Sequence, residues 1–122
     1  HPDQDVLNMV LADKLVNADI KYNTQFSLNY QLKESSKNPV TNDTVFIHYI
    51  GPTKPWHDWA WDYPISQAFM AAKNASPWKD TALLKPVNSN QLRYSAKHML
   101  KKKQYIKGFG NYLLYFIKKL KH

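Results

Sequence analysis

The sequence predicts a mostly helical α+β chain that contains one or two short strands. Apolar residues recur at helical spacing near the N-terminus and through much of the second half. One run of β-branched and aromatic residues, 44–50, is typical of a buried strand. The length of 122 residues fits a single domain, and a hydrophobic fraction of 43% is enough to bury a core.

The first predicted helix lies close to the N-terminus. Val6, Leu7 and Val10 share one face at helical spacing. Asp3 is the predicted N-cap, because its carboxylate can accept the free backbone N–H groups of the first turn. Residues 35–43 are rich in Ser, Asn, Pro and Thr, so we expect a loop before the strand.

Three further helices are predicted in the second half. One begins near Pro64, and its apolar residues follow at helical spacing. Another covers residues 91–103, and the last covers residues 105–120 with a broad apolar face. Gly108 and Gly110 weaken the start of that last helix in water.

Charge divides the chain into two halves. Residues 1–60 carry five lysines and seven acids, whereas residues 61–122 carry twelve basic residues and two acids. An anionic partner is therefore expected to meet the second half. The sequence has no cysteine, which excludes disulfides, thiolate metal sites and cysteine nucleophiles. No apolar run reaches the ~18 residues of a membrane-spanning helix.

Two short motifs could carry chemistry. The residues Asp3-Gln4-Asp5 lie at a helix start, where their oxygens could hold sugar hydroxyls or stabilise a developing cation. Helix capping and compensation of the helix dipole are the simpler interpretation of this motif.

The second motif follows the predicted strand. The strand delivers His48 at its carboxyl end, and Gly51 and Lys54 follow in a loop. Strand ends that lead into glycine-containing loops are common sites for phosphates and metals, and imidazole is a common metal ligand. A buried strand histidine with a tight Gly-Pro turn is the simpler interpretation here.

Aromatic residues gather in two places. The first group could pack on sugar faces or anchor the core, and comprises Trp56, Trp59, Trp61, Tyr63 and Trp78. The second lies in the basic tail, which fits either a helix in the plane of a membrane or a docked terminal helix. The predicted membrane-binding residues are Lys107, Phe109, Tyr112, Phe116, Lys118 and Lys119.

An alternative function is a basic, aromatic binding module without catalysis, directed to nucleic acid or to an anionic membrane. The charge of the second half and its tyrosines support this alternative. The chain lacks any recognised nucleic-acid motif, so no nucleic-acid partner is expected.

Taken together, the motifs resemble the family 8 glycosyltransferases, and the bacterial lipopolysaccharide core glucosyl- and galactosyltransferases in particular. The resemblance rests on D-Q-D-V-L-N at residues 3–8, Tyr22-Asn23, H-x-x-G-x-x-K-P-W-H at residues 48–57, and Ser76-Pro77-Trp78-Lys79. It runs over nearly the whole chain in order.

The resemblance implies a GT-A fold and retaining transfer of a hexose from UDP-glucose or UDP-galactose to the lipopolysaccharide core. It implies that His48 binds Mn²⁺ or Mg²⁺ and that Gly51 and Lys54 contact the diphosphate. Asp3 would bind hydroxyls of the donor sugar, with Asp5 in a supporting role. Gln4 would lie beneath the anomeric carbon, as a weak nucleophile or an electrostatic stabiliser.

One departure from the family pattern shapes the expected organisation. The D-x-D metal motif of the family lies in its N-terminal half, and the only D-x-D here is Asp3-Gln4-Asp5, which the resemblance assigns to the other motif. The uridine-binding strands are absent too. The chain also opens on His1-Pro2-Asp3 without an initiator Met, so we expect a C-terminal fragment that is inactive alone. Residues 1–60 would form the edge of the catalytic domain and residues 61–122 a helical, basic C-terminal region. The expected location is the cytoplasm, peripherally on the inner membrane.

Overall fold

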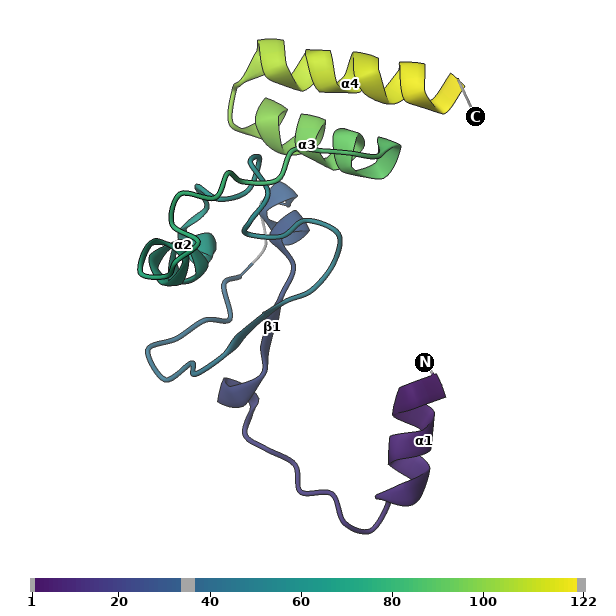
Figure 1. The fold of residues 1–122 in the computed structure, drawn as a ribbon, viewed down its shortest axis with the longest axis vertical. Helices are drawn as coiled ribbons and strands as arrows, with labels where there is room; N and C mark the ends of the chain where they lie inside the picture. The colour runs from purple at the N-terminus through teal and green to yellow at the C-terminus, as the bar shows by residue number, and fades with distance from the viewer. Residues whose placement is uncertain (1, 34–36, 121–122) are drawn as a thin grey trace.

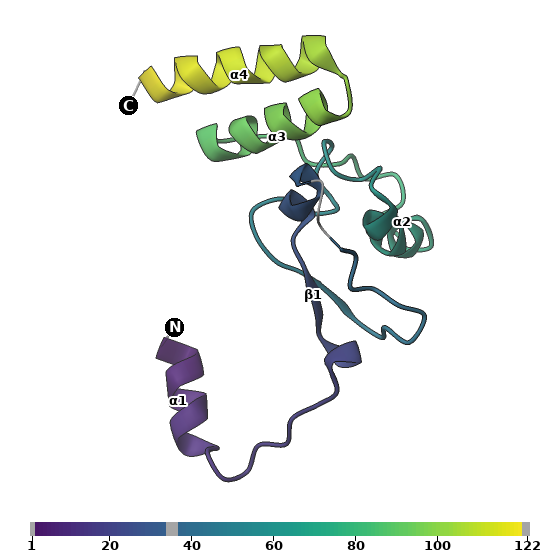
Figure 2. The same cartoon turned by 180° about the vertical axis from the view of Figure 1, so that it is seen from behind.

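The structure, a computed structural model, describes residues 2–33 and 37–120. Its first element, α1 (Pro2–Val10), stands apart from the remainder of the described chain, joined to it by an extended segment (Figures 1 and 2). No residue of α1 is buried. The helix itself confirms the prediction, but Asp3 is not its N-cap. Pro2 already occupies the first turn, where its fixed φ and missing N–H are tolerated, and Asp3 and Asp5 follow within that turn.

A small parallel sheet follows, made of β1 (Thr24–Phe26) and β2 (Ile47–Tyr49). Gln25 is paired with His48 in its register. Short 3₁₀-helices, η1 (Ile20–Tyr22) and η2 (Leu28–Leu32), bracket β1. The predicted strand 44–50 was too long and was wrongly expected to be buried, because β2 pairs only with a three-residue neighbour and exposes every second side chain.

The remaining elements are helical. The 3₁₀-helix η3 (Pro64–Ser66) leads into α2 (Gln67–Asn74), and α3 (Ser89–Lys101) and α4 (Tyr105–Leu120) follow. These elements confirm the three helices predicted in the second half. Figure 1 shows α3 and α4 running side by side as a hairpin above the sheet.

The hairpin depends on two backbone positions. Lys103 adopts a positive φ of 62° in the turn after α3, which reverses the chain. Gly108 is buried against α3, and a Cβ built there would lie 2.7 Å from Cδ2 of Leu100. The glycine therefore permits the close approach of the two helices, a role that the sequence alone did not reveal.

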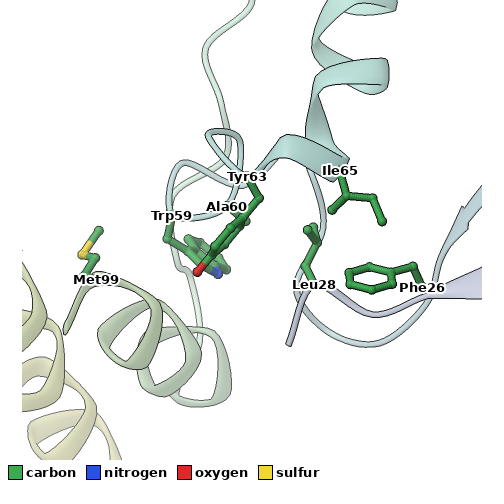
Figure 3. Packing of buried hydrophobic residues seen from close by; sticks show 7 residues of the cluster. All are labelled: Phe26, Leu28, Trp59, Ala60, Tyr63, Ile65 and Met99. Carbon is green, nitrogen blue, oxygen red and sulfur yellow. The ribbon is translucent and has the colours of Figure 1, made fainter. Parts of the chain in front are cut away.

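A hydrophobic core joins the sheet, the segment before η3, and α3 (Figure 3). Its members are Phe26, Leu28, Trp59, Ala60, Tyr63, Ile65 and Met99. Tyr49 packs against this cluster, and its hydroxyl donates to the backbone oxygen of Ile65 at 2.6 Å. The core thus holds β2, and the loop that follows it, against the helical half.

About half of the described chain is helical, and its strands form one short two-stranded sheet, which confirms the coarse fold class. Within the described ranges, no helix is both long enough and apolar enough to cross a membrane. The GT-A assignment and the division at residue 60 remain predictions.

Candidate functional site

The loop that follows β2, residues 50–57, is the centre of the candidate site. Gly51 has a φ of 80°, a conformation that side chains strongly disfavour. A Cβ at this position would lie 2.8 Å from Oγ of Ser27. Backbone geometry and close approach therefore both require the glycine, and the loop folds tightly against the segment after β1.

Lys54 is half-buried in this loop and its ammonium group is held by neutral partners. Its Nζ donates to the backbone oxygen of Tyr49 and lies 5.9 Å from the centroid of the Trp56 ring. No carboxylate of the described residues forms an ion pair with it. A positive charge that is positioned but not neutralised is suited to binding an anion.

His57 closes the loop from inside. It is buried, its ring stacks on Trp59 at a centroid distance of 4.1 Å, and its Nδ1 accepts the backbone N–H of Lys54 at 3.0 Å. Burial lowers the pKa of His57, and the nearby charge of Lys54 lowers it further. His57 is therefore a neutral structural support for the loop.

His48 lies in the middle of β2 rather than at its carboxyl end, and its side chain is exposed. Its Nδ1 is 3.0 Å from Oδ1 of Asn23. An amide oxygen can only accept, so Nδ1 carries the proton and the lone pair of Nε2 is free to bind a cation. The imidazole fits a metal ligand of this type, but the described residues contain no cluster of three or more metal-binding side chains around it.

The structure does not bring the D-Q-D motif to this loop. Asp3, Gln4 and Asp5 are exposed on α1, which lies away from β2 in both views (Figures 1 and 2). The apolar side chains Val6, Leu7 and Val10 of the same helix are also exposed, because α1 buries no residue on the described chain. The predicted roles of the motif stay predictions.

A buried polar network supports the loop, and sequence analysis missed it. The hydroxyl of Thr53 donates to Oδ1 of Asn29 at 2.6 Å, and His98 Nε2 lies 3.0 Å from the same oxygen. The hydroxyl of Tyr63 lies 2.6 Å from Nδ1 of His98. Thr53 and His98 are both fully buried.

The proton positions in this network follow from its acceptors. Asn29 Oδ1 can only accept, so His98 carries its proton on Nε2 and its Nδ1 accepts from Tyr63. The pKa of His98 is lowered to about 3, mainly by burial and secondly by the positive charge of Lys102. Burial also raises the pKa of Tyr63 above its ordinary value. The network is neutral, and it ties the loop to α3 through η2.

The aromatic residues fall into two groups: some anchor the core, and the others are exposed. Trp59 and Tyr63 belong to the core, whereas Trp56, Trp61 and Trp78 are exposed. Trp56 packs on Phe69 of α2 at a centroid distance of 5.6 Å. The exposed rings are the ones available to a ligand.

The predicted membrane-binding residues of the tail also differ in their exposure. Five of the predicted membrane-binding residues are exposed: Lys107, Phe109, Phe116, Lys118 and Lys119. Tyr112 is instead half-buried beside Leu100 and Lys101 of α3, because its position on α4 faces the hairpin partner. The exposed residues leave an apolar face on α4 with lysines around it.

These features define a class of site: a tight loop whose lysine has no carboxylate partner among the described residues, directly after a strand that exposes an imidazole. Such a site suits a ligand that carries phosphate and a cation. The comparisons identify the family. Residues 1–60 match the profile "Glycosyl transferase family 8" and residues 63–119 match "Glycosyl transferase family 8 C-terminal". The chain belongs to glycosyltransferase family 8.

Its relatives include several lipopolysaccharide enzymes. The chain is 86% identical over its full length to lipopolysaccharide glucosyltransferase WaaO of Escherichia coli K12, and covers 36% of it. Over 98% of its length it is 59% identical to lipopolysaccharide 1,3-galactosyltransferase of Salmonella typhimurium LT2, covering 35%. It is 34% identical to a lipopolysaccharide 1,2-glucosyltransferase of Escherichia coli, covering 36%. The chain thus spans about a third of these relatives. No solved structure matches the chain.

Proposed function

We propose that this chain is the C-terminal part of a GT-A hexosyltransferase that moves glucose or galactose from a UDP-sugar to the lipopolysaccharide core with retention at the anomeric carbon. Membership of family 8 and relatives that are named lipopolysaccharide glucosyl- and galactosyltransferases support the proposal. Because the chain spans about a third of those relatives, the activity is assigned to the longer protein.

The geometry of loop 50–57 is the observation that supports the proposal most directly. When UDP departs, negative charge develops on its terminal phosphate, and the ammonium group of Lys54 can stabilise that charge. Gly51, whose φ of 80° lets the loop turn tightly, is assigned to contact the diphosphate through its backbone. Nε2 of His48 would supply one ligand for Mn²⁺ or Mg²⁺, and the other ligands would come from outside the described residues. A bound divalent cation would neutralise the charge of the diphosphate.

The sugar side of the site is assigned to α1. Asp3 accepts hydrogen bonds from donor hydroxyls and Asp5 supports that side. Gln4 lies beneath the anomeric carbon, as an electrostatic stabiliser or a weak nucleophile. This assignment requires the exposed apolar face of α1 to pack on the remainder of the longer protein, which would bring the motif to the loop.

Lys54 provides the test. In the full-length protein, Lys54→Ala should lower kcat for hexose transfer by about 10²–10³, the usual effect of removing one electrostatic stabiliser of the transition state. Lys54→Arg should restore little activity, because a planar fork does not replace a point charge in a tight loop. Lys33→Ala, a change of an exposed lysine, is the matched control. Wild-type kinetics of Lys54→Ala would leave the loop with a structural role only.

His48 tests the metal assignment separately. His48→Ala should lower turnover and raise the concentration of Mn²⁺ that gives half-maximal activity, because one ligand is lost. His48 is exposed, so the substitution should leave the thermal unfolding midpoint unchanged. An unchanged metal titration would remove His48 from the site.

A further inference from the structure

A groove of about 870 Å³ lies between the segment after the candidate loop and the helical hairpin. We propose that this groove is a saccharide-binding subsite that holds part of the acceptor oligosaccharide, away from the point of transfer. The inference rests on the proposed function. The volume falls in the range that small-molecule sites usually have.

The groove carries oxygen acceptors that lack donors. Asp58 lines it, and Oδ1 of Asp58 is buried without a hydrogen-bond partner among the described residues. Asn111 also lines it, and its amide group donates to Oγ of Ser95 at 2.9 Å and to Sδ of Met99 at 3.3 Å. Those contacts fix the amide and leave its carbonyl oxygen available. Sugar hydroxyls are suitable donors to both residues.

An aromatic ring and two ammonium groups complete the lining. Trp61 is 44% exposed and borders the groove, so its face can receive the C–H side of a sugar ring. Lys85 and Lys107 also line the groove, near enough to Asp58 to oppose the rise in its pKa that burial causes. The groove therefore combines a stacking surface with both hydrogen-bond donors and acceptors.

Gly110 provides an independent observation. It lies inside α4 and lines the groove, although glycine destabilises a helix interior by about 1 kcal/mol relative to alanine. A Cβ at Gly110 would meet no atom within 4 Å, so packing does not explain this glycine as it explains Gly108. Keeping the groove open does explain it.

The position of the groove indicates which saccharide it holds. Asp58, which lines the groove, directly follows the loop that carries Lys54, and residues of α4 line the groove as well. The apolar side chains Phe109 and Phe116 of α4 are exposed, away from the groove lining. An acceptor whose lipid lies at that outer face would pass along the groove towards the loop, whereas a UDP-sugar would bind at the loop itself.

The test fills the groove in the full-length protein. Acceptor and donor KM are measured with UDP-hexose and with core oligosaccharide freed from its lipid. Gly110→Trp should raise the acceptor KM at least about tenfold, corresponding to 1.4 kcal/mol, with donor KM and kcat changed less than about twofold. Gly110→Ala should have a smaller effect than the tryptophan. Ala71→Trp, at an exposed position of α2 outside the groove, is the bulk-matched control.

Trp61→Ala serves as the second variant, because an exposed ring can be removed without unfolding the core. It should also raise the acceptor KM and leave the donor KM unchanged. An unchanged acceptor KM in Trp61→Ala and in folded Gly110→Trp overturns the inference; if Gly110→Trp does not fold, Trp61→Ala alone decides.

If the wild-type protein transfers no hexose, the proposed function has failed, and this result is distinct from a failure of the groove inference. In that case saturation-transfer NMR with the same oligosaccharide decides about the groove. Binding that is lost in Trp61→Ala supports the inference, and absence of binding to the wild type overturns it.

Discussion

At the scale of single residues, Thr53 links the candidate loop to the helical half. Its fully buried hydroxyl donates to Asn29, which also accepts from His98. Thr53→Val keeps the shape and removes the donor, so it should lower the free energy of unfolding by about 1–2 kcal/mol. Urea denaturation of the full-length protein measures the change.

The control for this prediction is Thr41→Val. Thr41 is exposed, and its two described hydrogen bonds use its backbone N–H and its backbone oxygen rather than the hydroxyl. It should change the free energy of unfolding by less than about 0.5 kcal/mol. Equal effects of the two substitutions would show that the buried network does not stabilise the loop.

The buried imidazole of His98 makes stability depend on pH. Its folded-state pKa of about 3 lies below the ordinary value of 6.5, so the unfolded chain binds a proton that the folded chain excludes. The contribution of His98 is present above pH 6.5 and is lost as the pH falls from 6.5 towards 3, by up to about 1.4 kcal/mol per pH unit.

His98→Gln should therefore reduce this pH dependence, because glutamine does not titrate. Free energies of unfolding at pH 7, 6 and 5 are compared for the wild type and the variant; His57, whose pKa is also lowered, is present in both. The wild type should lose stability more steeply on acidification. Parallel curves would mean that the folded protein binds a proton at His98 as readily as the unfolded chain does.

The sequence predicted the loop residues of the site but not their support. Gly51 and Lys54 lie three positions apart in one motif, so local pattern reveals them. The network joins Asn29 to Thr53 and His98 across separations of 24 and 69 residues. Such pairings depend on tertiary packing, which a single sequence does not specify. Helical spacing did not reveal His98 either, because it places this residue away from the apolar stripe formed by Leu92, Ala96 and Met99.

At the scale of elements, the two glycines of α4 should respond oppositely to alanine. Gly108→Ala would place a Cβ 2.7 Å from Cδ2 of Leu100 and push the helices apart, so stability should fall by about 1–3 kcal/mol. Gly110→Ala meets no atom and should raise stability by about 0.5–1 kcal/mol through helix propensity. Thermal unfolding of both variants measures the difference, and changes of equal sign would contradict the hairpin geometry.

Helices were predicted better than strands for a physical reason. The period of apolar residues in 91–103 and 105–120 extends over several turns, and α3 and α4 follow it closely. Strand β1 has only three residues between two 3₁₀-helices, too few to show alternation, and it was not predicted. The run at 44–50 has high β-propensity throughout, but a strand extends only as far as its partner does.

At the scale of the whole molecule, charge and apolar exposure coincide on the hairpin. Residues 61–122 hold twelve basic residues against two acids. Large apolar side chains are exposed along α4: Tyr105, Ile106, Phe109, Leu113, Leu114, Phe116, Ile117 and Leu120. An exposed apolar face this continuous, flanked by lysines, is typical of a helix that lies in the plane of an anionic membrane.

We therefore expect the full-length protein to bind vesicles that contain anionic lipid and to be released by salt, because screening shortens the reach of the lysine charges. Each lysine near an anionic surface contributes about 1 kcal/mol, so the double variant Lys118→Glu/Lys119→Glu should weaken binding by more than about tenfold. Phe109→Ser/Phe116→Ser should weaken binding to the same vesicles through loss of apolar burial.

Cosedimentation with anionic and neutral vesicles at low and high salt measures these effects. The charge-matched control is Lys14→Glu/Lys33→Glu, which changes two exposed lysines of the acidic half and should leave binding nearly unchanged. If binding followed total charge alone, both double variants would weaken it equally. Equal binding to neutral and anionic vesicles would show instead that the lysines around α4 do not contribute, and that any attachment is hydrophobic.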